Sequence, residues 1–528
     1  MSTLRNPLLP GFYPDPSICK KGGDYYLVTS SFEYFPGIPI FHSRDFVHWH
    51  QIGHVLTRRS QANLDGLCPS RGIYAATIRY HEKTDTFYVV TTLVGNAPYY
   101  DNINFYVTAS DPAGPWSDPV IIKGAEGIDP TLVFDGEEVY YLGNRRPNPD
   151  IPECESRHIW LQRLDLPTGT LVGERVTLLE HGALYDAVAP EGPHLYHIKD
   201  WYYLIIAEGG TDHNHCSTVF RSHSIFGPYE CNPRNPLITH RNLKRDYPIN
   251  STGHADIVEL NDGSWWAVLL ASRPDGGDYR NLGRETFAVP MAWEDGWPVF
   301  SPQTGCVEFS YPGPDLPECI WEPEPACDHF LTQELGTCWN MLRTPDYETF
   351  SLNDRPGFLR LYLNRHTLAE VASPAFIGRR QQHMCFTART FMEFIPAALG
   401  EAAGITMFYN NQFYYSLMLQ STETGVSIVL TRQICGDNTR LYSAPYENDG
   451  IYFKIHMRYQ SIDFYFSQDG QTWIPAGTTV SGTILNKETA GGFTGTYIAL
   501  YATADGKESQ NHADEEVEGG IRVRHNEE

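Results

Sequence analysis

Three kinds of feature are scarce in this sequence of 528 residues: paired cysteines, long apolar runs and basic side chains. Its eleven cysteines are scattered, and no Cys-X-X-Cys pair is present, which argues against a zinc cage or a complete disulfide framework. No apolar run approaches the length of a transmembrane helix, and residues 1–7 contain no apolar stretch typical of a signal peptide. These absences predict a cytoplasmic protein with reduced thiols.

The charge of the chain is strongly one-sided. It has 64 Asp and Glu residues but only 39 Lys and Arg residues, so its net charge is −25. Nucleic acids and anionic membranes are bound by basic patches, and this balance argues against both as partners. Aromatic residues make up 13% of the chain, which favours β-structure and flat-faced ligands such as sugars. The length predicts two domains.

One sequence pattern recurs five times within the first 300 residues: an acidic or glycine-containing turn followed by a short aromatic strand. The aromatic residues that align in the five copies are Tyr26, Tyr88, Tyr140, Tyr202 and Trp266. Successive copies lie 52 to 64 residues apart. Repeats of this length that are built from short strands are typical of propeller blades, so the pattern predicts a five-bladed β-propeller.

The positions eleven or twelve residues before each of these aromatic residues are equivalent positions of the repeat. They are Asp15, Ala76, Asp129, Glu191 and His254. Equivalent positions of successive blades face the same central axis, so three carboxyl groups and a histidine are predicted to meet there. A single Asp beside a proline is most often a turn residue. Three acidic residues at equivalent positions of the repeat, each next to Pro or Gly, indicate an active site instead.

The chain divides into two parts joined by a proline-rich stretch. Residues 1–310 hold the five repeats, and residues 311–328 contain five prolines, which indicates a linker. Residues 329–528 alternate apolar and polar positions, as in 452–459, and show little helical periodicity. We expect an all-β fold: a five-bladed β-propeller catalytic domain, then a β-sandwich of the concanavalin or jelly-roll type with a charged C-terminal tail.

Three carboxyl groups around one axis suit the cleavage of a glycosidic bond. In that reaction one carboxyl group protonates the leaving oxygen, and the other activates the attacking water or is itself the nucleophile. Inversion needs a gap of roughly 6.5–9.5 Å between them, which leaves room for a water molecule, and blades on opposite sides of an axis can provide it. A third carboxyl group near the acid raises the pKa of that acid by like-charge repulsion.

The acids lie within recognisable motifs: Pro14-Asp15-Pro16-Ser17, Gly127-Ile128-Asp129-Pro130, Pro190-Glu191-Gly192-Pro193-His194, Glu208-Gly209-Gly210-Thr211, Thr252-Gly253-His254-Ala255-Asp256 and Leu282-Gly283-Arg284-Glu285-Thr286. Together these motifs resemble glycoside hydrolase family 43, most closely its two-domain β-xylosidases and α-L-arabinofuranosidases. The resemblance extends into residues 373–382 of the second part. It implies an inverting hydrolase with Asp15 as general base, Glu191 as general acid and Asp129 as modulator of the acid's pKa.

The resemblance also implies the residues that line the sugar pocket, namely Phe32, Tyr74, Thr211, His254 and Arg284. Arg284 matches the arginine that binds hydroxyls of the terminal sugar. Tyr74 is a departure, because relatives often carry Trp at this position, and the smaller ring changes the stacking surface for the second sugar. A second departure is the segment 513–517, which lacks the aromatic residues common in relatives. Both changes concern leaving-group recognition and leave the three acids in place.

The acid–base chemistry requires no cofactor. The resemblance leaves open a calcium ion near His254, and waters would have to complete its coordination because a single His is a poor ligand set for a hard cation. No protein ligand set for a metal is assigned. The sequence leaves the oligomeric state open, a homo-oligomer included.

The expected substrate is a xylo- or arabino-oligosaccharide from which β-1,4-linked xylose is removed at the non-reducing end. An α-L-arabinofuranosidase is the main alternative, because xylopyranose and arabinofuranose present similar hydroxyl sets. A non-catalytic sugar-binding propeller is a remote alternative, since it would not need all three acids. A fructan-cleaving, invertase-like enzyme is disfavoured because its Asn-Asp-Pro-Asn-Gly opening is absent.

Overall fold

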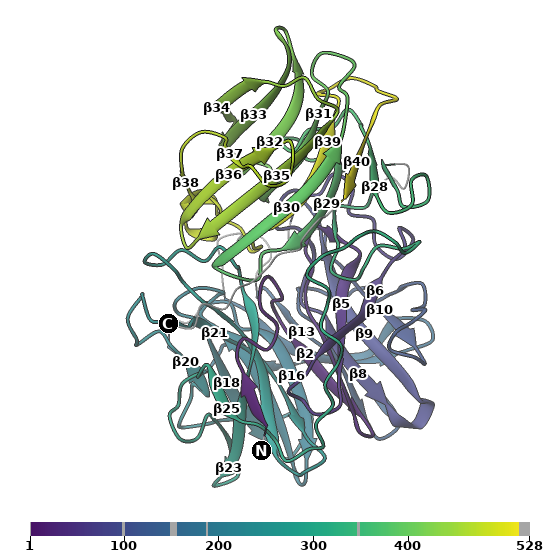
Figure 1. Cartoon of the computed structure of the whole chain (residues 1–528). Helices are drawn as coiled ribbons and strands as arrows, with labels where there is room; N and C mark the ends of the chain where they lie inside the picture. Colours follow the sequence, from purple (N-terminus) through teal and green to yellow (C-terminus); the bar gives the residue numbers. More distant parts are fainter. Residues whose placement is uncertain (1, 98–100, 148–155, 186–187, 346–348, 517–528) are drawn as a thin grey trace.

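The computed structural model describes residues 2–97, 101–147, 156–185, 188–345 and 349–516 of the chain. Strands dominate these ranges, and the helical elements are short: η1 (Glu82–Thr84), η3 (Gly482–Ile484) and α1 (Lys487–Ala490). None of the described helices is long and apolar enough to cross a membrane. Figure 1 shows a lower body built from the first part of the chain and an upper body built from its last part. The expected all-β fold is confirmed.

Five antiparallel sheets follow one another along the first part of the chain, and we call them blades 1 to 5. Blade 1 comprises β2 (Ser17–Lys21), β3 (Asp24–Val28), β5 (Gly37–Ser43) and β6 (His50–Leu56). Blade 2 comprises β8 (Thr77–His81), β9 (Thr86–Val94), β10 (Ile103–Ala109) and β11 (Val120–Ile121), with β7 (Gly72–Ile73) also paired to β9. Blade 3 comprises β12 (Thr131–Asp135), β13 (Glu138–Arg145), β14 (His158–Asp165) and β15 (Thr170–Leu179).

Blades 4 and 5 complete the set. Blade 4 comprises β16 (Glu191–Ile198), β17 (Trp201–Glu208), β18 (Cys216–Ser222) and β19 (Glu230–Cys231), with β20 (Ile238–Thr239) also paired to β18. Blade 5 comprises β21 (Asn250–Glu259), β22 (Trp265–Ser272), β23 (Glu285–Glu294) and β24 (Trp297–Phe300).

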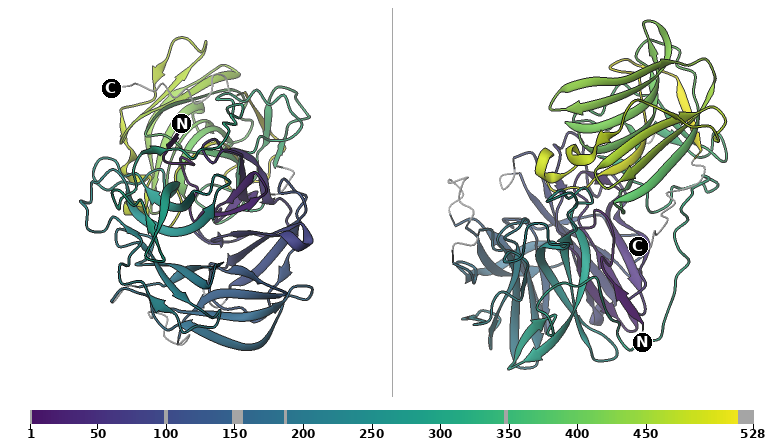
Figure 2. Two further views of the ribbon diagram at one scale, coloured as in Figure 1. Left: turned by 90° about the horizontal axis from the view of Figure 1, so that it is seen from below. Right: turned by 60° about the vertical axis from the view of Figure 1, so that its left-hand side comes forward.

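The five blades form a closed ring. Their first strands contact one another in the order β2, β8, β12, β16, β21 and back to β2, and the view from below shows the sheets arranged around an axis (Figure 2). The start of the chain helps to fasten the ring. Here β1 (Thr3–Arg5) pairs with β25 (Ser310–Pro312), and the Asn6 amide donates to the Ala288 carbonyl at 2.8 Å. The expected propeller therefore brings the first strand of every blade to one axis.

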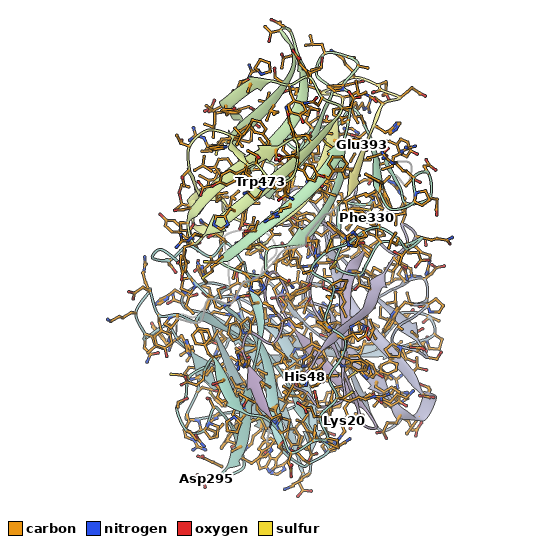
Figure 3. All side chains as sticks on the ribbon, viewed as in Figure 1. Lys20, His48, Asp295, Phe330, Glu393 and Trp473 are labelled. Carbon is orange, nitrogen blue, oxygen red and sulfur yellow. The ribbon has the colours of Figure 1, made fainter. Side chains whose placement is uncertain are left out.

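The repeated aromatic residues lie in the second strand of each blade, and four of the five pack against a ring of a neighbouring blade. Ring pairs join Tyr26 to Phe87 at 5.1 Å, Tyr88 to Phe134 at 5.2 Å, Tyr140 to Phe226 at 5.8 Å and Trp266 to Phe46 at 5.3 Å. Each such contact adds about 0.5–1.5 kcal/mol beyond its area burial. The sequence repeat is thus a packing repeat, and side chains fill the space between the ribbons of both bodies (Figure 3).

The second part forms two packed sheets. The larger contains β27 (Phe350–Ser351), β28 (Leu359–Tyr362), β40 (His512–Glu516), β30 (Cys385–Glu393), β35 (Gly450–Arg458), β36 (Ser461–Ser467), β37 (Ile474–Pro475) and β38 (Val480–Ser481). The smaller contains β29 (Ala375–Arg380), β39 (Tyr497–Thr503), β31 (Ala402–Asn410), β32 (Phe413–Thr422), β33 (Gly425–Ile434) and β34 (Asp437–Pro445). Alternate residues of β30 and β35 are buried between the sheets, as expected for a sandwich.

The smaller sheet also packs against the propeller. Strands β31 and β39 are buried along their whole length, so both of their faces are covered. Tyr497 of β39 stacks on Tyr34, which lies between β3 and β5 of blade 1, with ring centroids 3.9 Å apart. In addition, β26 (Met341–Leu342) pairs with β4 (Tyr34–Phe35). This contact places the sandwich directly beside Phe32, one of the predicted pocket residues.

The proline-rich segment 311–328 runs along blade 1. The Cys319 N–H donates to Asp45 Oδ2 at 2.8 Å, and the Trp321 ring stacks on His50 at 5.6 Å. The view on the right of Figure 2 shows this connection passing along the outside of the propeller. The exact limits of the two domains stay a prediction.

Candidate active site

A cavity of about 370 Å³ lies at the propeller axis. Its lining includes all eight residues singled out in the sequence, namely Asp15, Phe32, Tyr74, Asp129, Glu191, Thr211, His254 and Arg284. They come from all five blades, mostly from loops and strand ends, with His254 inside β21. Residues that are up to 269 positions apart therefore meet in one volume.

The carboxyl residues sit where the innermost strands begin. Asp15 and Asp129 each lie two residues before their strand, β2 or β12, and Glu191 is the first residue of β16. Asp15, Asp129 and His254 share a φ of 54°, in the left-handed region that non-glycine residues rarely adopt. Such conformations cost about 1–3 kcal/mol and cluster at functional sites. The shared angle shows that equivalent positions of three blades enter the axis in the same way.

Asp15 is held as a carboxylate by two donors. Arg284 Nη1 donates to Oδ1 at 2.7 Å, and Ser30 Oγ donates to Oδ2 at 2.6 Å. Burial acts to raise the pKa of Asp15, but Arg284, His254 and the Ser30 hydroxyl outweigh it and hold the pKa below its usual value. Asp15 is therefore ionised at neutral pH and able to accept a proton.

Asp129 has the opposite electrostatic environment. Burial raises its pKa well above the usual value, and the nearby charges of Glu191 and Asp15 raise it further. Arg284 and Arg157 offset only part of this effect. A site with three neighbouring carboxyl groups thus retains a proton more readily than an isolated carboxyl group would.

Aromatic rings from both domains wall the cavity. Phe32 lies 4.8 Å from Tyr74 and 6.1 Å from Phe493, measured between ring centroids. Phe493 belongs to the sandwich and lies between α1 and β39, so the second domain contributes directly to the cavity. The Tyr74 hydroxyl donates to the Ser70 carbonyl at 2.8 Å, which fixes the ring edge-on to Phe493 at 6.3 Å.

His254 faces Asp15 across the cavity wall, with Nδ1 3.9 Å from Oδ1 of Asp15. Burial lowers the pKa of His254, so the ring is neutral at neutral pH. Across the described ranges, no group of three or more His, Cys, Asp or Glu side chains is arranged to hold a metal ion. A calcium ion bound through waters near His254 stays a prediction.

Several lining residues were not found from the sequence, among them Arg71, Arg157 and Phe493. Phe493 carries no local signal, because its place depends on how the sandwich docks against the propeller. The sandwich segment 513–517 behaves differently. Its described residues belong to β40, which pairs with β28 and β30 inside the larger sheet, and they do not line the cavity. Val517 lies outside the described residues.

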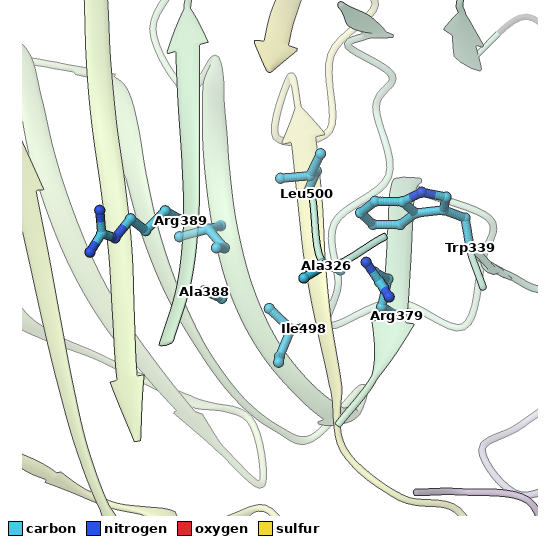
Figure 4. Close-up of a pocket in the computed structure, with 9 residues that line it drawn as sticks. Ala326, Trp339, Arg379, Ala388, Arg389, Ile498 and Leu500 are labelled. Carbon is cyan, nitrogen blue, oxygen red and sulfur yellow. The ribbon is translucent and has the colours of Figure 1, made fainter. Parts of the chain in front are cut away.

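Two other cavities lack comparable chemistry. A small one of about 30 Å³ lies beside Ala326, Trp339, Arg379 and Ile498 (Figure 4), and its lining has no carboxyl group. That volume has room for only about one or two water molecules. A polar cleft of about 850 Å³ contains Asp65 and Glu508, but each is near an arginine, Arg59 or Arg365. Neither cavity brings several carboxyl groups together.

Comparisons with known proteins agree with this architecture. The family model for glycosyl hydrolases of family 43 matches residues 4–298, and the model for the concanavalin A-like C-terminal domain of β-xylosidases matches residues 327–516. A xylosidase/arabinosidase of Butyrivibrio fibrisolvens is 41% identical over 97% of this chain and 98% of its own. A non-reducing end α-L-arabinofuranosidase of Bacteroides ovatus is 39% identical over 97% and 93%. The crystal structure of a xylan β-1,4-xylosidase from Bacillus halodurans superimposes with a TM-score of 0.91 at 34% identity, over 97% of this chain and 98% of that one.

Proposed function

Because the chain belongs to the glycosyl hydrolases of family 43, we propose that it is an inverting exo-glycosidase that removes terminal β-1,4-linked xylose from the non-reducing end of xylo-oligosaccharides. One observation carries this proposal: three carboxyl groups from blades 1, 3 and 4 line a single cavity. Relatives named as xylosidases and arabinosidases, which match nearly the whole chain, support the substrate class.

Asp15 is the proposed general base. Its carboxylate is buried and ionised, and Arg284 and Ser30 hold both of its oxygens. It would accept a proton from the water that attacks the anomeric carbon, and that water would form the new C–O bond as the glycosidic bond breaks. The sugar is released with inverted configuration, and no covalent bond to the protein forms.

Glu191 is the proposed general acid, and Asp129 its modulator. Glu191 begins β16 and would donate its proton to the glycosidic oxygen as the leaving group departs. Asp129 and Glu191 repel one another when both are ionised, and this repulsion is one cause of the raised pKa of Asp129. The same repulsion keeps a proton in this part of the site near neutral pH, where the acid needs it.

Arg284 and the aromatic wall would bind the terminal sugar. Arg284 Nε is buried, and no hydrogen-bond partner for it exists among the described residues. A buried donor without a partner is costly, so a sugar hydroxyl is a reasonable acceptor for it. The cavity of about 370 Å³ is at the small end for ligand pockets, which supports an exo mode of action. Product analysis should detect only monosaccharide from the start, and early xylobiose would contradict this mode.

An α-L-arabinofuranosidase remains the second candidate, because the relative from Bacteroides ovatus is named for that activity. Side-by-side assay of 4-nitrophenyl β-D-xylopyranoside and 4-nitrophenyl α-L-arabinofuranoside distinguishes the two. Proton NMR of the first-formed sugar then tests the stereochemistry, since inversion of a β-xyloside releases α-xylose before mutarotation. Initial release of β-xylose would overturn the inverting mechanism. Absence of activity on both substrates would favour a non-catalytic sugar-binding propeller.

A further inference from the structure

The short helix α1 of the sandwich lies against the propeller beside the cavity. Lys487 Nζ donates to the Thr211 carbonyl at 3.2 Å and lies 3.3 Å from Asp212 Oδ2. Thr211 is itself a lining residue of the cavity. A side chain of the second domain therefore holds the backbone of the pocket wall in the first domain.

A buried arginine of the propeller completes the contact. Arg280 Nε donates to Glu488 Oε1 at 2.6 Å, and the Arg280 N–H donates to Oε2 of the same carboxylate at 3.1 Å. Its Nη2 donates to Asp212 Oδ1 at 2.7 Å. We call Asp212, Arg280, Lys487 and Glu488 the docking cluster. It has two positive and two negative side chains, so its charges balance; Arg280 and Glu488 are largely buried, whereas Asp212 stays more than half exposed.

The docking cluster also contacts the wall of the cavity through Phe493. Phe493, three residues after α1, has a ring that lies near two cations: Lys487 Nζ is 5.9 Å and Arg284 Cζ 5.8 Å from the ring centroid. The Phe493 N–H donates to Ser70 Oγ at 2.9 Å. The ring that walls the cavity is thus fixed both by the propeller and by the docking cluster.

We propose that Lys487 and Glu488 are positioning residues that set the affinity for the terminal sugar, by fixing Thr211 and Phe493 against the cavity. Neither side chain lines the cavity itself. They act through their neighbours: Lys487 on the Thr211 carbonyl and the Phe493 ring, and Glu488 on Arg280, which in turn holds Asp212. This inference rests on the proposed function only for its kinetic readout.

The rival interpretation is that the docking cluster only stabilises the fold. A purely stabilising contact would lower the melting temperature without changing KM for the active fraction. A positioning contact changes KM, because misplacement of a pocket wall by about an ångström is enough to weaken substrate binding. The ratio of effects on KM and kcat therefore separates the two.

The experiment uses the full-length chain and the activated aryl xyloside and arabinoside. Lys487→Met removes the ammonium but keeps a long apolar stem, Lys487→Arg keeps the charge, and Glu488→Gln removes the opposite charge. Lys507→Met is the matched control, because Lys507 is another sandwich lysine that donates to a main-chain carbonyl, that of Leu399 at 2.7 Å, away from the cavity. Steady-state kinetics are paired with amide hydrogen exchange of residues 209–213 and 485–496, which needs no activity.

We expect Lys487→Met to raise KM about tenfold with kcat changed less than about threefold, and to increase exchange in both segments. Glu488→Gln should act in the same direction, Lys487→Arg should largely restore KM, and Lys507→Met should match wild type. Unchanged KM and unchanged exchange in Lys487→Met, or an equal effect of Lys507→Met, would overturn the proposal. A wild-type chain inert toward both glycosides would defeat the proposed function alone, and the exchange data would still decide the role of the docking cluster.

Discussion

Arg284 Nη1 donates to Asp15 Oδ1 at 2.7 Å, although 269 positions separate the two residues in the chain. Both side chains are almost fully buried. The contact joins blade 5 to the start of blade 1. Burial acts to raise the pKa of Asp15, but Arg284, His254 and Ser30 together hold that pKa below its usual value. The ionisation of the proposed base therefore depends on a residue from the opposite end of the propeller sequence.

Replacing Arg284 by Gln should raise the pKa of Asp15, because burial then acts with less opposition. We expect the acidic limb of the kcat/KM profile to move to higher pH, and kcat/KM at its optimum to fall at least about 100-fold from lost sugar binding. Arg44→Gln is the matched control, since Arg44 forms an exposed pair with Asp24 in the same blade as Asp15. An acidic limb that does not move would contradict the assigned coupling.

Asp15→Asn should reduce turnover of every substrate by about 10²–10⁴-fold, because no carboxylate remains to deprotonate the attacking water. Added azide should not yield a glycosyl azide through a covalent enzyme intermediate, since inversion has none. Mass spectrometry of the protein and of the products checks both points. Detection of a covalent glycosyl-enzyme intermediate would contradict the inverting mechanism.

Glu191→Gln should nearly abolish cleavage of xylobiose while partly sparing aryl glycosides. Activated phenols leave without protonation, so a general acid matters much less for them, whereas a sugar alcohol needs the proton. Rates on xylobiose and 4-nitrophenyl xyloside, with circular dichroism to confirm folding, make the comparison. Equal losses on the two substrates in a folded protein would count against Glu191 as the acid.

Stability should depend on pH through Glu515, which is buried in β40 of the sandwich. Burial raises its pKa from 4.5 to about 8, and only the Thr390 hydroxyl opposes this. The unfolded chain releases this proton near pH 4.5 but the folded chain holds it until about pH 8. Its contribution to the free energy of unfolding is therefore complete below pH 4.5 and is lost, by up to about 1.4 kcal/mol per pH unit, as the pH rises to about 8.

Glu515→Gln should accordingly melt at a higher temperature than wild type at pH 8 and show a smaller loss between pH 5 and pH 8. Glu423→Gln, which alters an exposed glutamate of the same sandwich, serves as the control. Thermal melts at pH 5, 6.5 and 8 provide the measurement. The same pH slope in Glu515→Gln and wild type would show that this carboxyl group does not govern the dependence.

Removal of divalent cations by a chelator should leave at least part of the hydrolytic activity, because proton transfer by carboxyl groups needs no Lewis acid. Incubation with EDTA, followed by assay with and without added calcium, tests this. Complete loss that only calcium restores would make an ion near His254 essential.

Much of the site follows from the periodicity of the sequence. Asp15, Asp129, Glu191 and His254 are assigned to one axis because equivalent blade positions share an environment, whatever their separation in the chain. Phe32, Tyr74, Thr211 and Arg284 rest instead on motif resemblance. These four residues do not occupy equivalent positions of the repeat, so the repeat alone does not predict that they lie at the axis.

Alternating strands, aromatic spacing and the recurring position of the acidic residues are local patterns that repeat, so the all-β fold and an acidic axis could be predicted from the sequence. How the cavity is completed depends instead on the tertiary structure. Phe493 and the docking cluster enter the site because the smaller sandwich sheet packs on blade 1 and α1 meets Arg280. The tertiary structure also brings Arg284 and Ser30 to Asp15, whose pKa is lowered, and buries Asp129, whose pKa is raised. Both outcomes depend on which side chains become neighbours after docking and burial, and no local sequence pattern encodes those neighbours.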